Sequence, residues 1–416
     1  FRSCTLGEID SPEAGQLRNQ LLFANIDDPW MQAAALSARK LDYDGLLAES
    51  IRRSASTPEQ WRPLIERLAT MRSTQAGADE VRDLLLLATS EKSHAPGPWQ
   101  AAVLAGVAKG GKAGVLADPS LEAVRLRLLE QVLHHPRGDV RQASLAFLVR
   151  AGLPQGEALE GAKAQAVATI QNREADVADR TISIAFLAAA QPEASQALLL
   201  DLLQPAESTA IQKAALAALS QSGGDGLAEA WIARWPSLTD GMRSEVILAL
   251  LPSAPRRAVL INALEKGAIA PAYVTGSHRV RLIAQSDRPT RDRLRAIFST
   301  ESKDEERAKV IDSYRAALAS SAQDASPDRG KLVYQNQCSA CHPLGGQHGT
   351  PLGPDLNSIR IREPEAILTD ILDPNRSIAD GYTLWQITLQ DGVQKIGIIG
   401  SETTTSLTLR APGAPV

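Results

Sequence analysis

Residues 139–149 read DVRQASLAFLV, and this stretch contains the pattern that decides the fold of most of the chain. An acidic residue comes first, a bulky apolar residue follows it, and an Ala/Leu-rich run continues. Asp, Ser or Thr at a helix start accepts hydrogen bonds from amides that would otherwise be unpaired. Leu or Ile residues three or four positions apart then form one apolar face. The pattern therefore predicts an amphipathic helix that begins close to Asp139.

Similar stretches begin near residues 28, 98, 176, 208 and 240. In four successive copies the bulky residue falls at positions 140, 177, 211 and 242, so the copies are 37, 34 and 31 residues apart. A period of this length with two helices per unit is typical of an α-solenoid, because one helix pair cannot bury its apolar stripe alone. We therefore predict an all-α solenoid over residues 1–319, and its copies over 20–300 resemble HEAT repeats.

The composition changes near residue 320. Residues 320–329 are polar and have no helical stripe, which predicts a linker. Past residue 382 apolar and polar residues alternate over 384–389, 394–399 and 406–409, with Asp391-Gly392 as a hairpin turn signal. We expect residues 330–416 to form a small, mainly helical domain with a short β-hairpin or three-stranded extension.

The residues that carry chemistry are Cys338, Cys341 and His342, in the order C-x-x-C-H. This is the attachment signature of c-type haem. Two thiols at this spacing add across the two vinyl groups of the porphyrin, and the following histidine then lies beneath the iron as its axial ligand. The motif predicts one covalent haem c, with His342 as the ligand of the iron.

Other interpretations of this pentapeptide are chance, a zinc site and a thioredoxin-like redox pair. A zinc site would need Cys341 and His342, adjacent in sequence, to reach one tetrahedral metal, and no second cysteine pair completes it. A redox pair would need a βαβ setting, which this sequence lacks. The flanking residues favour haem, since a Gly330–Tyr334 helix precedes the motif and Gly353-Pro354-Asp355-Leu356 follows it.

With these flanks the segment resembles class I cytochrome c, which has an equivalent helix, the haem motif and a GP-x-L loop. The resemblance implies that Pro354 offers its carbonyl oxygen to the ring nitrogen of His342 that faces away from the iron. It also implies that Leu356 and Tyr334 pack against or near the porphyrin edge.

A narrower resemblance covers residues 326–410. After the haem motif and the Gly353–Leu356 loop come Asp373-Pro374-Asn375, Tyr382 and Gly397. This order is similar to that of the haem-binding domain family named for Pirellula and Verrucomicrobium. Members of that family often follow HEAT-like repeats and a sugar-dehydrogenase-like β-propeller in large exported proteins.

The sequence departs from class I cytochromes at the sixth iron ligand, which is a methionine in that family. The methionines here are Met31, Met71 and Met242, all before the haem motif. His348 is the nearest substitute, but its short tether to His342 favours the same side of the ring. We therefore expect the sixth ligand to be absent from these residues, and the chain to be part of a longer protein.

The predicted function is electron transfer through the haem, with the helical repeats as scaffold or docking surface for a redox partner protein or a fused donor domain. Two alternatives are an interaction protein that uses haem as a sensor, and the electron-accepting part of a larger dehydrogenase. No enzyme activity is expected of these residues themselves, because nucleophile-elbow, phosphate-loop, zincin and dinucleotide motifs are absent.

The charge, hydropathy and haem chemistry limit partners and location. A net charge of −4 argues against a broad cationic surface for nucleic acid. No apolar stretch is long enough to predict a transmembrane segment. Covalent haem attachment takes place outside the cytoplasmic membrane, so we expect a periplasmic or otherwise extracytoplasmic bacterial protein. The isolated Cys4, the His134-His135 pair and the arginines between 279 and 295 are interpreted as structural or solvated. His94 and His278 are interpreted as solvated residues of loop-like stretches.

Overall fold

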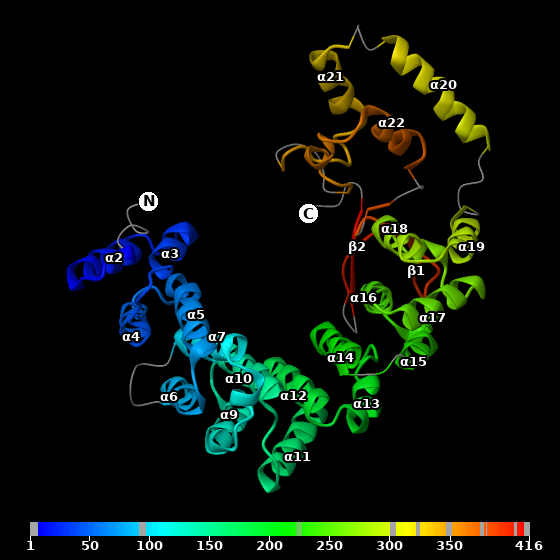
Figure 1. The fold of residues 1–416 in the computed structure, drawn as a ribbon. Coiled ribbons are helices and arrows are strands. Elements are labelled where there is room, and N and C mark those ends of the chain that lie inside the picture. Colours follow the sequence, from blue (N-terminus) through cyan, green and yellow to red (C-terminus); the bar gives the residue numbers. More distant parts are fainter. Residues whose placement is uncertain are drawn as a thin grey trace. The chain divides into compact units, whose positions relative to one another are not determined.

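The computed structural model describes residues 7–90, 97–222, 224, 226–299, 305–321, 325–346, 352–374, 378–379, 381–402 and 406–411. The chain forms two compact units, Phe1–Gln196 and Ala197–Val416. Figure 1 shows both as helices with one small sheet near the C-terminal end of the second unit. The predicted fold class, helical repeats followed by a small domain with a three-stranded extension, is confirmed.

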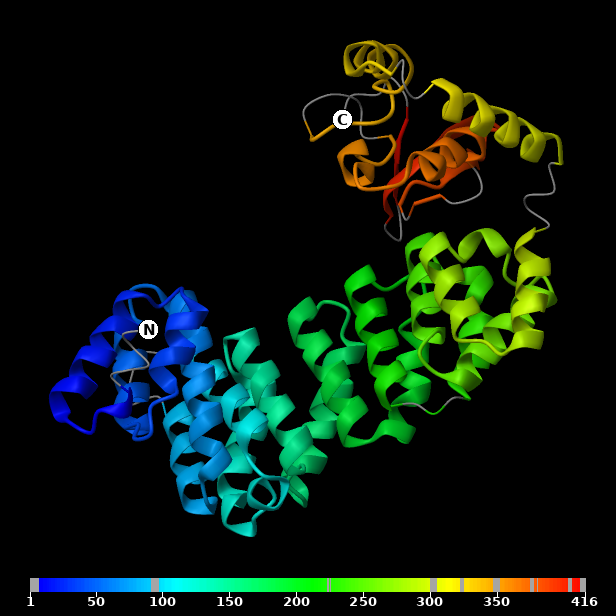
Figure 2. The same cartoon turned by 45° about the horizontal axis from the view of Figure 1, so that its top comes forward.

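The first unit consists of antiparallel helices that stack in succession, which Figure 2 shows from a second direction. Helix α5 packs against α4, α6 and α7, and α10 packs against α7, α9 and α12. The helices are α2 (Pro12–Ala24), α3 (Pro29–Leu36), α4 (Tyr43–Arg53), α5 (Pro58–Gln75), α6 (Ala78–Thr89), α7 (Pro98–Gly110), α8 (Ala113–Leu116), η1 (Pro119–Leu121), α9 (Glu122–His134), α10 (Gly138–Ala151), α11 (Glu157–Gln171) and α12 (Val177–Ala190), and α13 (Pro192–Asp201) contains the boundary to the second unit. Each helix thus buries its apolar stripe against its neighbours, as helical repeats require.

Small residues set how closely these helices approach. Gly106 of α7 lies against α5, where a Cβ atom would stand 2.5 Å from the Glu66 carbonyl oxygen and 2.6 Å from the Ala69 Cβ. Gly110, one turn later, meets the Thr70 backbone in the same way. Helices α5 and α7 can therefore pack backbone to backbone only because both positions lack a side chain.

The predicted helix starts agree with the structure. Asp28 accepts from the Trp30 amide (2.8 Å) and Asp176 from the Ala178 amide (2.8 Å), as N-caps do. Asp139 is an exception, because α10 begins at Gly138 and the N-cap position is Arg137. Asp139 therefore lies in the first turn of the helix, where it pairs with Arg137 (3.0 Å).

The second unit continues with helices and ends in the sheet. Its elements are α14 (Thr209–Ser222), α15 (Leu227–Arg234), η2 (Trp235–Ser237), α16 (Asp240–Leu250), α17 (Ala254–Glu265), η3 (Pro271–Tyr273), α18 (Gly276–Ala284), α19 (Arg288–Ser299), α20 (Glu305–Ser321), α21 (Pro327–Gln337), η5 (Leu356–Ile359), α22 (Pro364–Leu372), β1 (Leu384–Thr388), β2 (Gln394–Glu402) and β3 (Leu407–Arg410).

The sheet is antiparallel in the order β1-β2-β3, with Trp385 opposite Gly397 and an irregularity between Ile399 and Ser401. Gly392 has a φ of 83°, a left-handed conformation that glycine adopts without strain, and this forms the predicted turn. The three predicted strands are therefore confirmed.

The region of the predicted linker contains two helix ends. Helix α20 runs to Ser321, and α21 starts at Pro327 after the N-cap Ser326. Within residues 320–329 the positions outside both helices are 322–326, of which 325 and 326 are described. The division into a repeat domain and a haem domain at this place stays a prediction.

Candidate haem site

Helix α21 leads directly into the cysteine motif. The amide of Cys338 donates to the Tyr334 carbonyl (2.9 Å), which ends the helix at Gln337. The amides of Cys341 and His342 then both donate to the Cys338 carbonyl, at 3.0 and 2.9 Å. The chain therefore makes one further turn that brings both cysteines and the histidine together. The Cys338 thiol side chain is half-buried and Cys341 is exposed.

The imidazole of His342 is held by the loop that follows. Its Nδ1 lies 2.9 Å from the backbone carbonyl oxygen of Pro354. Because a carbonyl oxygen can only accept, Nδ1 carries the proton and Nε2 keeps its lone pair. Nε2 has no hydrogen-bond partner in the described part of the chain. The ring is thus in the tautomer that a metal ligand needs.

Gly353 fixes the plane of the same ring. A Cβ atom at this position would lie 2.6 Å from the His342 Nδ1 and 2.9 Å from Nε2, which is far inside van der Waals contact. The Gly353 amide also donates to the Cys341 carbonyl (2.6 Å). The loop backbone therefore lies flat against the imidazole and is tied to the cysteine turn.

Asp355 fastens the two sides of this loop. Its carboxylate accepts from the amides of Gly345 (2.9 Å), Gly346 (2.9 Å) and Asn357 (2.8 Å). These backbone hydrogen bonds, the one from Asn357 foremost, hold the pKa of the Asp355 carboxyl below its usual value. Gly345 and Gly346 have φ values of 64° and 72°, so both amides reach one carboxylate through a left-handed turn.

Tyr334 and Leu356 also join the cysteine turn. The Tyr334 hydroxyl donates to the His342 carbonyl (2.9 Å), and the Leu356 amide donates to the Pro343 carbonyl (2.9 Å). Both side chains are half-buried. Their packing against a porphyrin stays a prediction, but each residue clearly helps to position the histidine.

The region around this motif lacks a core of its own. Of the described residues beyond 325, Ile398 is the one apolar side chain that the structure buries. Large apolar side chains of the helices and loops point to solvent instead: Leu332, Val333, Leu344, Ile361 and Ile371. A segment of this size needs a core or a cofactor to be stable. A large flat apolar group attached at Cys338 and Cys341 would supply that core, so the residues present fit a haem.

The remaining candidates lie elsewhere. His94 and His348 fall outside the described residues. Met31, Met71 and Met242 lie on α3, α5 and α16. The described residues contain no group of three or more His, Cys, Asp or Glu side chains able to hold a metal ion.

The histidines that sequence analysis set aside have local partners. The His135 Nδ1 accepts from the Arg137 amide (3.1 Å), and burial lowers the pKa of this imidazole. His278, which the sequence placed in a loop, belongs to helix α18 and contacts the Thr275 hydroxyl (3.1 Å). The loop assignment was wrong because Thr275 is the N-cap of α18. Its carbonyl oxygen accepts from the Arg279 amide (2.8 Å), so the helix already includes His278.

Sequence reasoning missed two site residues, Gly353 and Asp355. Both stand inside the quoted Gly353-Pro354-Asp355-Leu356 loop. An Asp beside a turn often binds backbone amides, so Asp355 carried a local signal. Nothing local identifies Gly353, because its role depends on a ring eleven residues away.

Comparison with known proteins agrees with this geometry. Residues 327–392 match the family model described as Cytochrome c. No curated protein and no solved structure matches the chain. The match contains the cysteine motif, the Pro354 loop and the first strand, so this segment is a c-type cytochrome domain, which implies haem c and electron transfer. None of the described helices has the length and apolar character needed to cross a membrane.

Proposed function

We propose that the segment beyond residue 326 carries one haem c, bound covalently through Cys338 and Cys341, and that the protein transfers electrons through it. The observation that carries this proposal is the hydrogen bond between His342 Nδ1 and the Pro354 carbonyl, which leaves Nε2 unpaired beside two cysteines. His342 Nε2 would hold the iron of this group. The bound group supplies a reversible one-electron couple.

The chain's own residues would orient this ligand before the group is present. The Pro354 carbonyl fixes the proton on Nδ1 and makes Nε2 a stronger donor. Gly353 sets the plane of the imidazole, and Asp355 keeps the loop closed around it. A histidine held in this way would need to move little when the charge of the bound group changes. Such rigidity favours fast electron transfer.

The exposed apolar side chains would exclude water from the site. Leu332 and Val333 lie on the helix before the motif, and Ile361 and Ile371 follow the loop. These side chains, together with Leu356 and Tyr334, would set the polarity around the iron and therefore the reduction potential. The identity of the axial ligands is the other main determinant of that potential.

The helical repeats are proposed to be HEAT-like and to serve as a scaffold for a redox partner protein or a fused donor domain. Contacts within the second unit support this role. Arg307 pairs with Asp373 (3.4 Å), and the rings of Tyr273 and Trp385 lie 6.1 Å apart. These contacts join the repeat region to Asp373, at the end of α22, and to Trp385 of strand β1.

The same reasoning extends to the subtype of the haem domain and to the location of the protein. The domain is proposed to be of the Pirellula/Verrucomicrobium type, because Asp373-Pro374 ends a helix and Asp391-Gly392 forms a hairpin in the order that family has. The protein is proposed to be bacterial and extracytoplasmic, since haem c is attached there. It acts as an electron carrier and converts no substrate within these residues.

Protein-film voltammetry on the haem-matured 416-residue chain tests electron transfer. We expect one reversible one-electron couple that persists over repeated scans. His342→Ala should shift or abolish this couple, while His134→Ala, a histidine on a repeat helix, should leave it unchanged. A matured protein without a reversible couple, or a couple equally altered by both substitutions, would contradict the proposal.

A further inference from the structure

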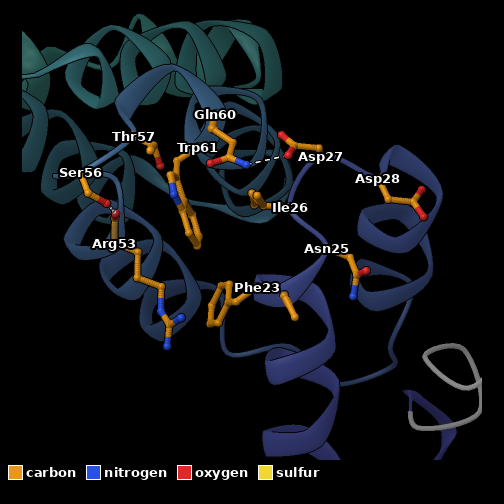
Figure 3. Close-up of a pocket in the computed structure, with 11 residues that line it drawn as sticks. Phe23, Asn25, Ile26, Asp27, Asp28, Arg53, Ser56, Thr57, Gln60 and Trp61 are labelled. Atoms are coloured by element: carbon orange, nitrogen blue, oxygen red, sulfur yellow. Dashed lines mark hydrogen bonds between the residues drawn. The ribbon is translucent and has the colours of Figure 1, made fainter.

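The first unit contains an open hollow that the haem does not use. It lies where the loop between α2 and α3 meets the loop between α4 and α5, and its volume is about 710 Å³ (Figure 3). Its walls come from the end of α2, from Asn25–Asp28, from the end of α4 and from the first turn of α5. Three helices thus contribute side chains to one solvent-facing site.

Two aromatic rings form the base of this hollow. The ring centroids of Phe23 and Trp61 lie 5.7 Å apart, and the planes are inclined by 48°. The guanidinium carbon of Arg53 lies 4.7 Å from the Phe23 centroid, a cation–π arrangement. Figure 3 shows both rings and the Arg53 side chain on one side of the hollow. Trp61 itself is buried (6 % exposed), so the base presents mainly the half-buried Phe23 ring next to a planar donor group.

Polar side chains form the edge of the hollow. The Gln60 amide donates to an Asp27 carboxylate oxygen (2.6 Å), and Figure 3 shows this bond spanning the edge. The Gln60 side-chain oxygen, the second Asp27 oxygen and the Thr57 hydroxyl keep hydrogen-bonding capacity, since none of them has a partner in the described structure. These groups can both accept from and donate to a ligand.

An exposed tryptophan lies at the next hollow, to which helix α5 also contributes: Gln60 lines the first hollow and Arg67, seven residues later, the second. Trp30, at the second residue of α3, has 83 % of its surface exposed, the largest fraction of any aromatic side chain that the structure describes. It borders a second hollow of about 570 Å³ with Leu36, Arg67 and Met71. Asp28 lines the first hollow and Pro29 the second, so the two hollows adjoin along the chain. One exposed ring needs no explanation by itself, but Trp30 stands beside two hollows and offers an amphipathic surface to a ligand.

The charges along this face nearly cancel. Asp27 and Asp28 are acidic, and Arg53 and Arg67 are basic. Glu49 binds the guanidinium groups of Arg52 and Arg53, at 2.5 Å each, and these bonds lower the pKa of Glu49 to about 2. One carboxylate thus serves two guanidinium groups, and together with Asp27, Asp28 and Arg67 the three acidic and three basic side chains of this face balance. A strongly anionic or cationic ligand gains little here, so the chemistry favours an uncharged one.

We propose that this face binds a neutral glycan. A pyranose has an apolar C–H face and a rim of hydroxyl groups. The exposed ring of Trp30 and the half-buried ring of Phe23 match the apolar face, and Asp27, Gln60 and Thr57 match the hydroxyl groups. A protein partner would instead favour a contiguous apolar centre from which water is excluded. Here polar side chains line the edge of the first hollow, and both hollows are open.

Native gel electrophoresis of the full matured chain in the presence of soluble polysaccharides tests this proposal. The panel contains neutral α- and β-glucans, xylan, galactomannan and galactan, with alginate and polygalacturonate as anionic polymers. We expect at least one neutral polymer to retard the protein and the anionic polymers to have no effect. Retardation by anionic polymers alone, or by no polymer, overturns the proposal.

Three variants connect binding to this face. Trp30→Ala and Gln60→Ala should each weaken the retardation at least tenfold, and Trp30→Phe should keep part of it. The matched control is Tyr314→Ala, which removes an exposed aromatic ring from helix α20. Because Trp30 is exposed, its replacement should not change the melting temperature. Unchanged retardation in both Trp30→Ala and Gln60→Ala, or equal loss in Tyr314→Ala, would show that the glycan binds elsewhere.

Discussion

The Nδ1 atom of His342 and the carbonyl oxygen of Pro354 are 2.9 Å apart, although twelve residues separate them in sequence. The residue before Pro354 is a glycine whose backbone lies against the same imidazole. One loop therefore determines where the proton of this imidazole lies and how its ring plane is oriented. A metal ligand requires both, and the polypeptide alone has them in place.

Gly353→Ala should disturb the histidine directly. The added Cβ would lie 2.6 Å from Nδ1, so the ring or the loop must move. Overpacking of this kind costs about 1–3 kcal/mol. We expect a lower yield of haem-loaded protein and a shifted reduction potential, measured by absorption titration and voltammetry. Gly330→Ala is the control, because nothing lies within 4 Å of its added Cβ. Equal potentials and yields in both variants would show that the ring is not confined by Gly353.

Tyr334→Phe removes the hydroxyl that donates to the His342 carbonyl (2.9 Å). A hydrogen bond of this type contributes about 1 kcal/mol to stability. We expect the free energy of unfolding of the holoprotein, measured with denaturant, to fall by about that amount while the haem content is retained. Tyr382→Phe serves as the comparison, since its hydroxyl makes no described hydrogen bond. An effect no larger than that of Tyr382→Phe would contradict a structural role for the bond.

Asp355 should make the haem domain sensitive to acid. Its pKa is lowered in the folded protein by the amides of Asn357, Gly345 and Gly346. A carboxyl with a lowered folded pKa adds stability above its unfolded value of about 3.9, and this contribution disappears as the pH falls through the folded pKa. The stability difference between the native chain and Asp355→Asn should therefore be largest near neutral pH and shrink below about pH 4.

Denaturant unfolding at a series of pH values measures this difference. Asp328→Asn, in the first turn of α21, provides the comparison for a carboxylate outside the loop. A difference that stays constant from neutral to strongly acidic pH would show that the charge of Asp355 does not matter.

The sequence also predicts the state of the sixth iron position. No methionine follows Cys341 in these 416 residues. We expect high-spin iron in this chain, binding of CO or cyanide to it, and a potential below that of a His/Met centre, because methionine ligation raises the potential. Electron paramagnetic resonance and CO titration measure these properties. A low-spin His/Met spectrum contradicts the prediction, as does a bis-histidine spectrum that disappears in His348→Ala.

Much of the fold follows from local patterns. The helix starts near Pro29, Pro98 and Val177, and the hairpin at Gly392, depend on capping residues, prolines and a glycine turn that act over a few positions. Asp139 shows the limit of this reasoning. It can pair with Arg137, and the helix then begins before it.

The site was predictable to a similar extent. The motif Cys338–His342 identifies the chemistry, and family resemblance implied the Pro354 contact. The turn beside Asp355 signals its local bond to the Asn357 amide, but the bonds that it accepts from Gly345 and Gly346 form only when the chain folds back. The bond from the Tyr334 hydroxyl to the His342 carbonyl likewise follows from no spacing in the sequence. The hollow beside Trp61 depends in the same way on two loops that are far apart in the sequence.

The central claim is one covalent haem on Cys338 and Cys341, and intact mass spectrometry under denaturing conditions tests it most directly. The matured chain should carry the added mass of one haem after acid-acetone extraction, and Cys4→Ala, which removes the third cysteine, should keep it. The double variant Cys338→Ala/Cys341→Ala should have the mass of the polypeptide alone. A matured wild-type chain at the mass of the bare polypeptide, or haem retained by the double variant, would contradict the account.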